Sequence, residues 1–392
     1  MPEIQRFSAL DALAVTAIKT IQSYLNVQGY FPHVHFELEG CVSSKKSHVT
    51  TIDFSQINKQ LAAQGIEGEL VPEYWRNQWE YVSLFNGQSP LKEAHNLAKT
   101  MKLLPSFFQL QGIDEVLIKP VVWGGDQAQL VHGSKNIFQG LNKAIHIPNA
   151  IQLNVSISDK NGDNLIADTL LGECLQQCLI NTSFDCALLF LPEPDAFERL
   201  TLKSDYQLFD ELCSPTDISG GHQGSIALYR QYGKHNQLLG EDVLIVNHLS
   251  EPLVKLVNWR KTARIEHRLG ASSVYYNAYV NVIFALLNVV DAVQIFNNGK
   301  TSVTSFLSAS NATPSALPSA LFDDNGALGA YSIFKNDTWF ERCLNEVERC
   351  METDNKCKSL GIGSQIKNAI LKQYQHRKIL LAPDTNKINP SA

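Results

Sequence analysis

Apolar residues recur at helical spacing near the N-terminus and then change to strict alternation. Ser8 precedes an amphipathic run from Ala9 to about Val27, and Gly29 follows it, which predicts a capped helix. In the next segment, 30–42, ionisable and apolar residues alternate with period two, which predicts a strand. One face holds His33, His35, Glu37 and Glu39, and the other holds Val34, Phe36 and Leu38. Such a strand forms the wall of a polar cavity or a solvated edge.

The remaining pattern mixes helices and strands without strict alternation or an internal repeat. Helices are predicted over 54–64 and 90–111, strands over 116–122 and 151–157, and a long loop over 123–150. This mixture predicts an α+β fold with an antiparallel sheet. The most apolar run, 280–296, is interrupted by Asn281, Asn288 and Asp291 and falls short of the ~20 apolar residues that span a bilayer. We therefore expect a buried helix there and no membrane partner.

Composition narrows the class of protein. The 392 residues are 44% apolar and 18% charged, which is typical of a globular protein with one large or two ordinary cores. A net charge of -6 excludes a dedicated nucleic-acid binder, because such proteins rely on clustered Lys and Arg. The N-terminus lacks the layout of a signal peptide, and the eight cysteines form no Cys-x-x-Cys pair, so we expect a cytoplasmic protein with buried thiols.

The segment Arg264-Ile265-Glu266-His267-Arg268 carries the strongest chemical signal. Its two arginines and one carboxylate alternate, so a strand would place three charged groups on one face. That arrangement is costly unless a ligand or a metal lies against it. A buried structural ion-pair triad, retained after a loss of activity, is the alternative interpretation.

Further segments match elements of one enzyme family in the same order. They are the helix from residue 8 with the strand 33–38, the run 61–66, Glu73 to Glu80, Pro90-Leu91, Ile118-Lys119-Pro120, the strand 151–156 with the turn 159–165, Phe197 to Leu200, Glu251-Pro252 with Trp259-Arg260, and 264–268. In this order they resemble the catalytic domain of glutamine synthetases. The resemblance implies a curved, largely antiparallel sheet flanked by helices. It places a catalytic domain at 1–295, with insertions at about 123–148 and 201–247, and a helical C-terminal part of the same domain at 296–392.

The resemblance also implies chemistry and residues for it. Glutamine synthetases use ATP to join a carboxylate to ammonia at a site with two divalent cations. Carried over by position, one cation would be held by His35, Glu73 and Glu80, and the other by His33, Gln152 and Glu266. The catalytic positions would be Arg199, Glu251, Arg264 and Arg268, and the nucleotide contacts would be Lys119 and Arg260.

This sequence departs from the family at the metal positions. Histidines stand where the family has two carboxylates, and Gln152 stands where it has a histidine. Imidazole favours manganese, zinc or iron over magnesium, so we expect manganese or magnesium, with zinc or iron as alternatives. Sliding the strand by four residues would instead place Glu37 and Glu39 at the carboxylate positions. The apolar matches of Phe36 and Leu38 favour the histidine register.

Three functions fit this sequence. The first is an ATP-dependent ligase that joins a carboxylate to an amine, with an altered site and an unassigned substrate. The second is a catalytically inactive homologue that binds a ligand or a partner. The third is a His/carboxylate metal enzyme on the same fold. The chain begins at the helix that follows the family's small N-terminal domain, so we expect a small homo-oligomer or a glutamine synthetase-related partner rather than a complete double ring.

Overall fold

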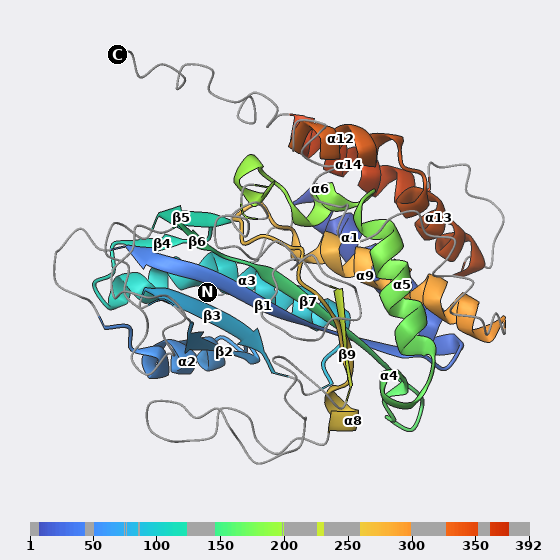
Figure 1. Ribbon diagram of the computed structural model, residues 1–392, viewed down its shortest axis with the longest axis horizontal. Coiled ribbons are helices and arrows are strands. Elements are labelled where there is room, and N and C mark those ends of the chain that lie inside the picture. The colour runs from blue at the N-terminus through green and yellow to red at the C-terminus, as the bar shows by residue number, and fades with distance from the viewer. Residues whose placement is uncertain are drawn as a thin grey trace, which may run out of the picture.

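A computed structural model gives the arrangement of the chain (Figure 1). It describes residues 8–43, 51–73, 75, 77–84, 87–123, 146–197, 199, 226–230, 259–298, 327–351 and 361–375. Most of the predicted insertions at 123–148 and 201–247, together with Glu251, lie outside the described residues.

Seven strands of the described residues form one sheet in which every pairing is antiparallel. The order is β2-β3-β1-β7-β9-β8, and β4 pairs with β1. The strands are β1 (Phe31–Ser43), β2 (Gly68–Pro72), β3 (Gln78–Ser83), β4 (Glu115–Leu117), β7 (Ile151–Ser158), β8 (Ile226–Tyr229) and β9 (Arg264–His267). With helices packed against this sheet, the predicted α+β class is confirmed (Figure 1).

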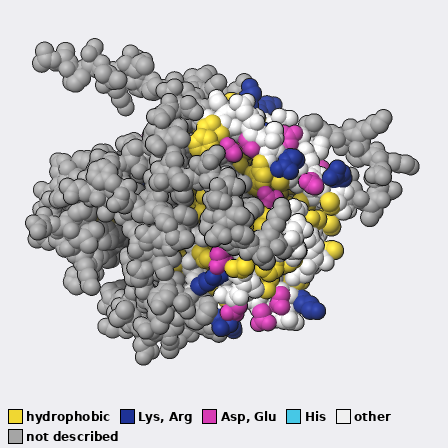
Figure 2. Space-filling view, turned by 45° about the vertical axis from the view of Figure 1, so that its right-hand side comes forward, with side chains coloured by type: hydrophobic (Ala, Val, Ile, Leu, Met, Phe, Trp, Pro, Cys, Tyr) yellow, Lys and Arg dark blue, Asp and Glu magenta, His cyan; other side chains and the backbone are white. Residues whose placement is uncertain are grey.

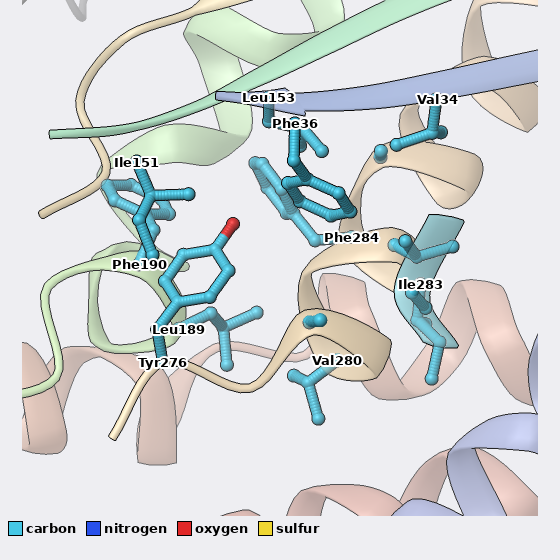
Figure 3. Close-up of a cluster of buried hydrophobic side chains, with 14 of the residues drawn as sticks. Val34, Phe36, Ile151, Leu153, Leu189, Phe190, Tyr276, Val280, Ile283 and Phe284 are labelled. Atoms are coloured by element: carbon cyan, nitrogen blue, oxygen red, sulfur yellow. The ribbon is translucent and has the colours of Figure 1, made fainter. Parts of the chain in front are cut away.

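The long helices that pack against the sheet are α1 (Ala9–Val27), α3 (Pro90–Leu110), α5 (Leu171–Ser183) and α9 (Ala278–Asn297). The predicted cap of α1 is present, because the Ser8 hydroxyl accepts from the Asp11 backbone and the Asp11 carboxylate accepts from the Ser8 backbone. Figure 3 shows Phe36 and Leu153 of the sheet against Phe284 of α9. The apolar face of β1 therefore points at the helices, and the ionisable face points away from them.

The shorter elements complete the described chain. They are the helices α2 (Phe54–Ala63), α4 (Leu165–Asp168), α6 (Ala187–Phe190), α8 (Trp259–Thr262), α12 (Ala327–Asn336), α13 (Trp339–Met351) and α14 (Ile362–Gln375), and the strands β5 (Val121–Trp123) and β6 (His146–Pro148). β5 and β6 pair with each other in a separate two-stranded sheet. The strand predicted over 116–122 is wrong in extent: β4 and β5 are separate strands, because Pro120 between them cannot donate to a ladder.

Helix α9 is the central element of the core. By length and composition it could cross a membrane, yet 78% of its most apolar window is buried inside the protein. It packs against α1, α3, α5, α6, α13 and β1. Asn281 and Asn288 are buried with it, and their amides donate to backbone carbonyls of Leu189 and Phe284. The apolar run thus serves as a core helix, and the amide nitrogens of these two polar interruptions donate within the protein.

The C-terminal helices close against the beginning of the chain. Both α13 and α14 pack on α1, and α13 also contacts α9. Figure 2 shows one side of the molecule, where Lys and Arg side chains alternate with Asp and Glu and no single sign of charge dominates.

Candidate functional site

Strand β1 lies in the middle of the sheet, and its ionisable side chains lie beside side chains of the neighbouring strands. Glu37 lies opposite Gln152 of β7, and Glu39 lies opposite Glu80 of β3. Directly opposite residues of antiparallel strands share a face, so these four side chains line the sheet face that points away from the helices. Glu266 of β9 joins the same face, because it lies opposite Asn154 of β7.

The structure corrects the histidine register that we favoured for this strand. Glu39, and not His35, lies across from Glu80, and His35 stands four residues away along β1, which is about 13 Å. His33 lies opposite Ser156 rather than Gln152. The two registers differ by an even number of residues, so both put the ionisable residues on the same face, and the apolar neighbours could not separate them.

The two histidines have local partners at the other end of the strand. His33 Nε2 lies 2.9 Å from the Ser158 hydroxyl, and His33 Nδ1 lies 3.4 Å from the Gln88 carbonyl oxygen. His35 is 4% exposed. Burial is the main cause that lowers the pKa of His35 to about 3, with the charges of His33 and Arg264 acting in the same direction. His35 is therefore neutral at physiological pH.

Glu266 is the centre of the arginine motif and is 1% exposed. Arg264 Nη2 donates to its Oε2 at 2.9 Å, and Arg268 Nε lies 3.1 Å from its Oε1. Burial lowers the pKa of Arg268, but the charges of Glu266, Tyr229, Glu37 and Glu39 outweigh it and raise that pKa. The alternate spacing in the sequence thus becomes a buried ion-pair triad.

Two amide side chains of β7 connect this triad to β1. Asn154 Nδ2 donates to Glu37 Oε1 at 3.1 Å, and Arg264 Nε donates to Asn154 Oδ1 at 2.6 Å. With the Gln152 amide in the orientation that satisfies its neighbours, Nε2 donates to Glu37 Oε2 at 3.0 Å and to Glu266 Oε1 at 2.8 Å. The carboxylates of β1 and β9 are therefore bridged by amides.

Arg199 is fully buried beneath the end of β9. Its Nη2 donates to the carbonyl oxygens of Arg268, Leu269 and Gly270 at 3.1, 3.2 and 2.8 Å. Burial lowers the pKa of Arg199 to about 10, against an opposing effect of Glu39. These contacts give Arg199 a positioning role, because it fixes the chain that follows the arginine motif.

The predicted nucleotide contacts do not join this cluster. Lys119 is exposed and follows β4, and Arg260 on α8 is exposed and paired with Asp168 of α4. Glu73 is half-buried just before the β3 hairpin, where its backbone nitrogen donates to the Gln78 carbonyl. Of the predicted site residues that the structure describes, Gln152, Arg264 and Arg268 contact the Glu266 carboxylate, and Arg199 contacts the Arg268 backbone.

The described residues contain no group of three or more His, Cys, Asp or Glu side chains arranged to hold a metal ion. The set proposed for one cation, His33, Gln152 and Glu266, does not fit, because His33 is bound at Ser158 and the Glu266 carboxylate accepts from Arg264 and Gln152 and is ion-paired with Arg268. Glu39 and Glu80 remain as an oxygen pair that suits a hard divalent cation.

Sequence reasoning missed Asn149, which is fully buried at the edge of this face. Its Oδ1 accepts from Gln78 Nε2 at 3.0 Å, and its Nδ2 donates to the Lys119 carbonyl at 3.0 Å. The next residue, Ala150, donates its backbone N–H to Glu39 Oε2 at 2.8 Å. An Asn before a strand is common at turns, so the sequence carried no signal for this contact.

No protein-family model and no curated protein matches the sequence. Solved structures do match it. A crystal structure of a novel glutamine synthase homolog superposes with a TM-score of 0.57 at 12% identity, over 95% of this chain and 72% of that one. The chain has a glutamine synthetase-like fold.

Two structures of GmaS agree with this assignment. The ligand-free form gives a TM-score of 0.51 at 13% identity, over 94% of this chain and 76% of that one. The complex of GmaS with ADP gives 0.51 at 12%, over 94% and 77%. The predicted resemblance is confirmed for the fold, and at these identities the reaction has to be argued from the residues of the site.

Proposed function

We propose that the chain is an ATP-dependent ligase of the glutamine synthetase-like type, which joins a carboxylate to an amine at an altered site. The observation that carries this proposal is the gathering of four carboxylates, Glu37, Glu39, Glu80 and Glu266, with two arginines on one face of the sheet. The glutamine synthetase-like fold and the ADP complex of GmaS support it.

In this proposal the residues of the site have different roles. Glu39 and Glu80 hold one divalent cation, manganese or magnesium, which would neutralise the phosphates of ATP when bound. Arg264, whose side chain is 19% exposed, is the guanidinium that can reach a substrate. It stabilises negative charge that develops on a transferred phosphoryl group. Arg268 is 3% exposed and holds Glu266 in place.

The proposal is tested by the reaction itself. Purified chain with ATP and manganese should release phosphate when a carboxylic acid and an amine are both present, and less when either is left out. A panel of amino acids and dicarboxylates with ammonia or a primary amine would identify the substrate class. Arg264→Lys should lower the rate by 10-fold or more, because lysine cannot reproduce the fork of hydrogen bonds. Phosphate release at the same rate with and without the amine would contradict the ligase proposal.

One observation favours a second function. In this alternative the chain is a catalytically inactive homologue that binds a ligand or a partner protein. The Glu37 carboxylate accepts hydrogen bonds from two amides, and the Glu266 carboxylate accepts from an amide and from Arg264. Absence of both nucleotide binding and phosphate release would support this alternative. The third alternative, a His/carboxylate metal enzyme, is less favoured, because Glu80 lies opposite Glu39 and not opposite His33 or His35. A cytoplasmic location and a small homo-oligomer belong to the proposal.

A further inference from the structure

Gln152 occupies the space between two carboxylates that belong to different strands. Both hydrogens of its Nε2 are used, one towards Glu37 Oε2 at 3.0 Å and one towards Glu266 Oε1 at 2.8 Å. The side chain is 2% exposed, so water does not compete for these bonds. A single amide nitrogen therefore links β1 to β9 across β7.

The charges around this amide already balance. The carboxylates of Glu37 and Glu266, which the amide joins, lie in one network with the guanidinium groups of Arg264 and Arg268, which gives two negative and two positive charges. Three of these four residues are less than 9% exposed, and Arg264 is partly exposed. A divalent cation added between Glu37 and Glu266 would leave two uncompensated positive charges in a buried place, which is strongly unfavourable.

The hydrogen bonds around Glu37 and Glu266 also argue against a cation between these two carboxylates. Each oxygen of Glu37 and Glu266 accepts from a side-chain N–H or lies against a guanidinium, namely Asn154, Gln152, Arg264 or Arg268. A cation between these carboxylates would require the Gln152 amide to turn its oxygen towards them, which breaks both hydrogen bonds of Nε2 and places that nitrogen against other donors. The family's arrangement of two cations therefore does not fit the residues of this chain.

We infer that the Gln152 amide takes the place of a divalent cation between Glu37 and Glu266, so that this half of the site is held together without metal and the chain binds at most one divalent ion. The position of that single ion, at Glu39 and Glu80, rests on the proposed function. The replacement of the other ion by Gln152 does not.

The experiment counts manganese ions on the full-length chain by equilibrium dialysis and follows the melting temperature with and without Mn²⁺. Gln152→His offers an imidazole nitrogen at the same place, and Gln152→Glu adds a third carboxylate. Each variant should bind one more ion than the wild type, and Mn²⁺ should raise its melting temperature by several degrees more. Gln177→His, which replaces a buried amide of α5 that donates to Asn181, is the matched control and should bind as the wild type does.

Two ions on the wild-type chain would overturn the inference, even if neither variant folds. Variants that fold and bind no additional manganese would also overturn it. A nucleotide titration on the wild type separates this result from the proposed function. If the variants gain an ion while the wild type binds no nucleotide, the inference stands and the ligase proposal fails.

Discussion

At the scale of single residues, the site depends on groups that compensate one another. Glu266 contacts Arg264, Arg268 and Gln152 while almost fully buried. Burying such charges costs several kcal/mol per ion, which only the partners offset. Removal of one member is therefore more damaging than replacement of the whole set.

Glu266→Gln tests this dependence. The change leaves the buried Arg268 and the partly exposed Arg264 with one carboxylate fewer, and we expect a loss of about 3 to 5 kcal/mol in the free energy of unfolding. Urea denaturation measures it. Glu173→Gln is the matched control, because its partner Arg230 also makes two bonds but both side chains are 27–29% exposed, and we expect a loss of about 1 kcal/mol or less. Equal losses would contradict a buried network.

A second residue, Glu93 of α3, predicts a pH dependence. It is fully buried, and its Oε2 has no hydrogen-bond partner among the described residues. Burial raises the pKa of Glu93 from 4.5 to about 7, against hydrogen bonds from Ser83 and Asn96 that lower it. The folded state then holds a proton that the unfolded state has released. The stability contribution is complete below about pH 4.5 and is lost as the pH rises to about 7.

Glu93→Gln should remove this dependence, because the amide keeps the shape without the charge. Between pH 5 and pH 8 we expect the wild type to lose up to about 3 kcal/mol relative to the variant. Urea titrations at both pH values measure the difference. Parallel pH profiles for the two proteins would show that Glu93 stays ionised in the fold.

The sequence allowed the arginine motif to be predicted, because alternate charges on a strand must share a face. It did not allow the partners to be chosen. His33, His35, Glu37 and Glu39 all have the same parity along β1, and only the pairing with β3 and β7 selects Glu37 and Glu39. Pairing of distant strands is a tertiary property that local pattern does not specify.

At the scale of elements, strand β1 determines the geometry of the site. It pairs with β3, β7 and β4, and its register places Glu39 opposite Glu80. Gly40, the residue after Glu39, lies opposite Trp79, which is fully buried. A Cβ at Gly40 would lie 2.3 Å from the Trp79 ring, so this glycine permits the close approach of the two strands.

Gly40→Ala should therefore displace β1 from β3. We expect a loss of about 1 to 3 kcal/mol or more in the free energy of unfolding, together with a change in tryptophan fluorescence, because overpacking forces Trp79 to move. Gly29→Ala is the control: that glycine has a φ of 85° but no atom within 4 Å of an added Cβ, so only backbone strain of about 1 kcal/mol is expected. An unchanged fluorescence spectrum in Gly40→Ala would contradict the close packing of Trp79.

Elements with strong local signals could be predicted from the sequence, and elements without them could not. Helix α1 begins after its predicted cap Ser8, and the predicted apolar run 280–296 lies within the observed helix α9. The β5–β6 pair escaped prediction, since it depends on contacts between residues 121–123 and 146–148, which are far apart in the sequence.

At the scale of the whole molecule, the sheet separates two environments. On one face α9 and its neighbours bury an apolar core, and on the other Glu37, Glu39, Glu80 and Glu266 come together with Arg264 and Arg268. The fold is glutamine synthetase-like, yet its polar face is largely neutralised by its own side chains. Whether such a face still binds nucleotide is the central question for function.

Calorimetric titration of the wild-type chain with Mn-ATP answers that question most directly, with Glu80→Ala as the comparison. We expect the wild type to bind one nucleotide per chain in a saturable manner. In Glu80→Ala the affinity should be lower by 10-fold or more. Absence of binding heat in the wild type, or equal affinity in both proteins, would contradict a nucleotide-dependent site on this face of the sheet.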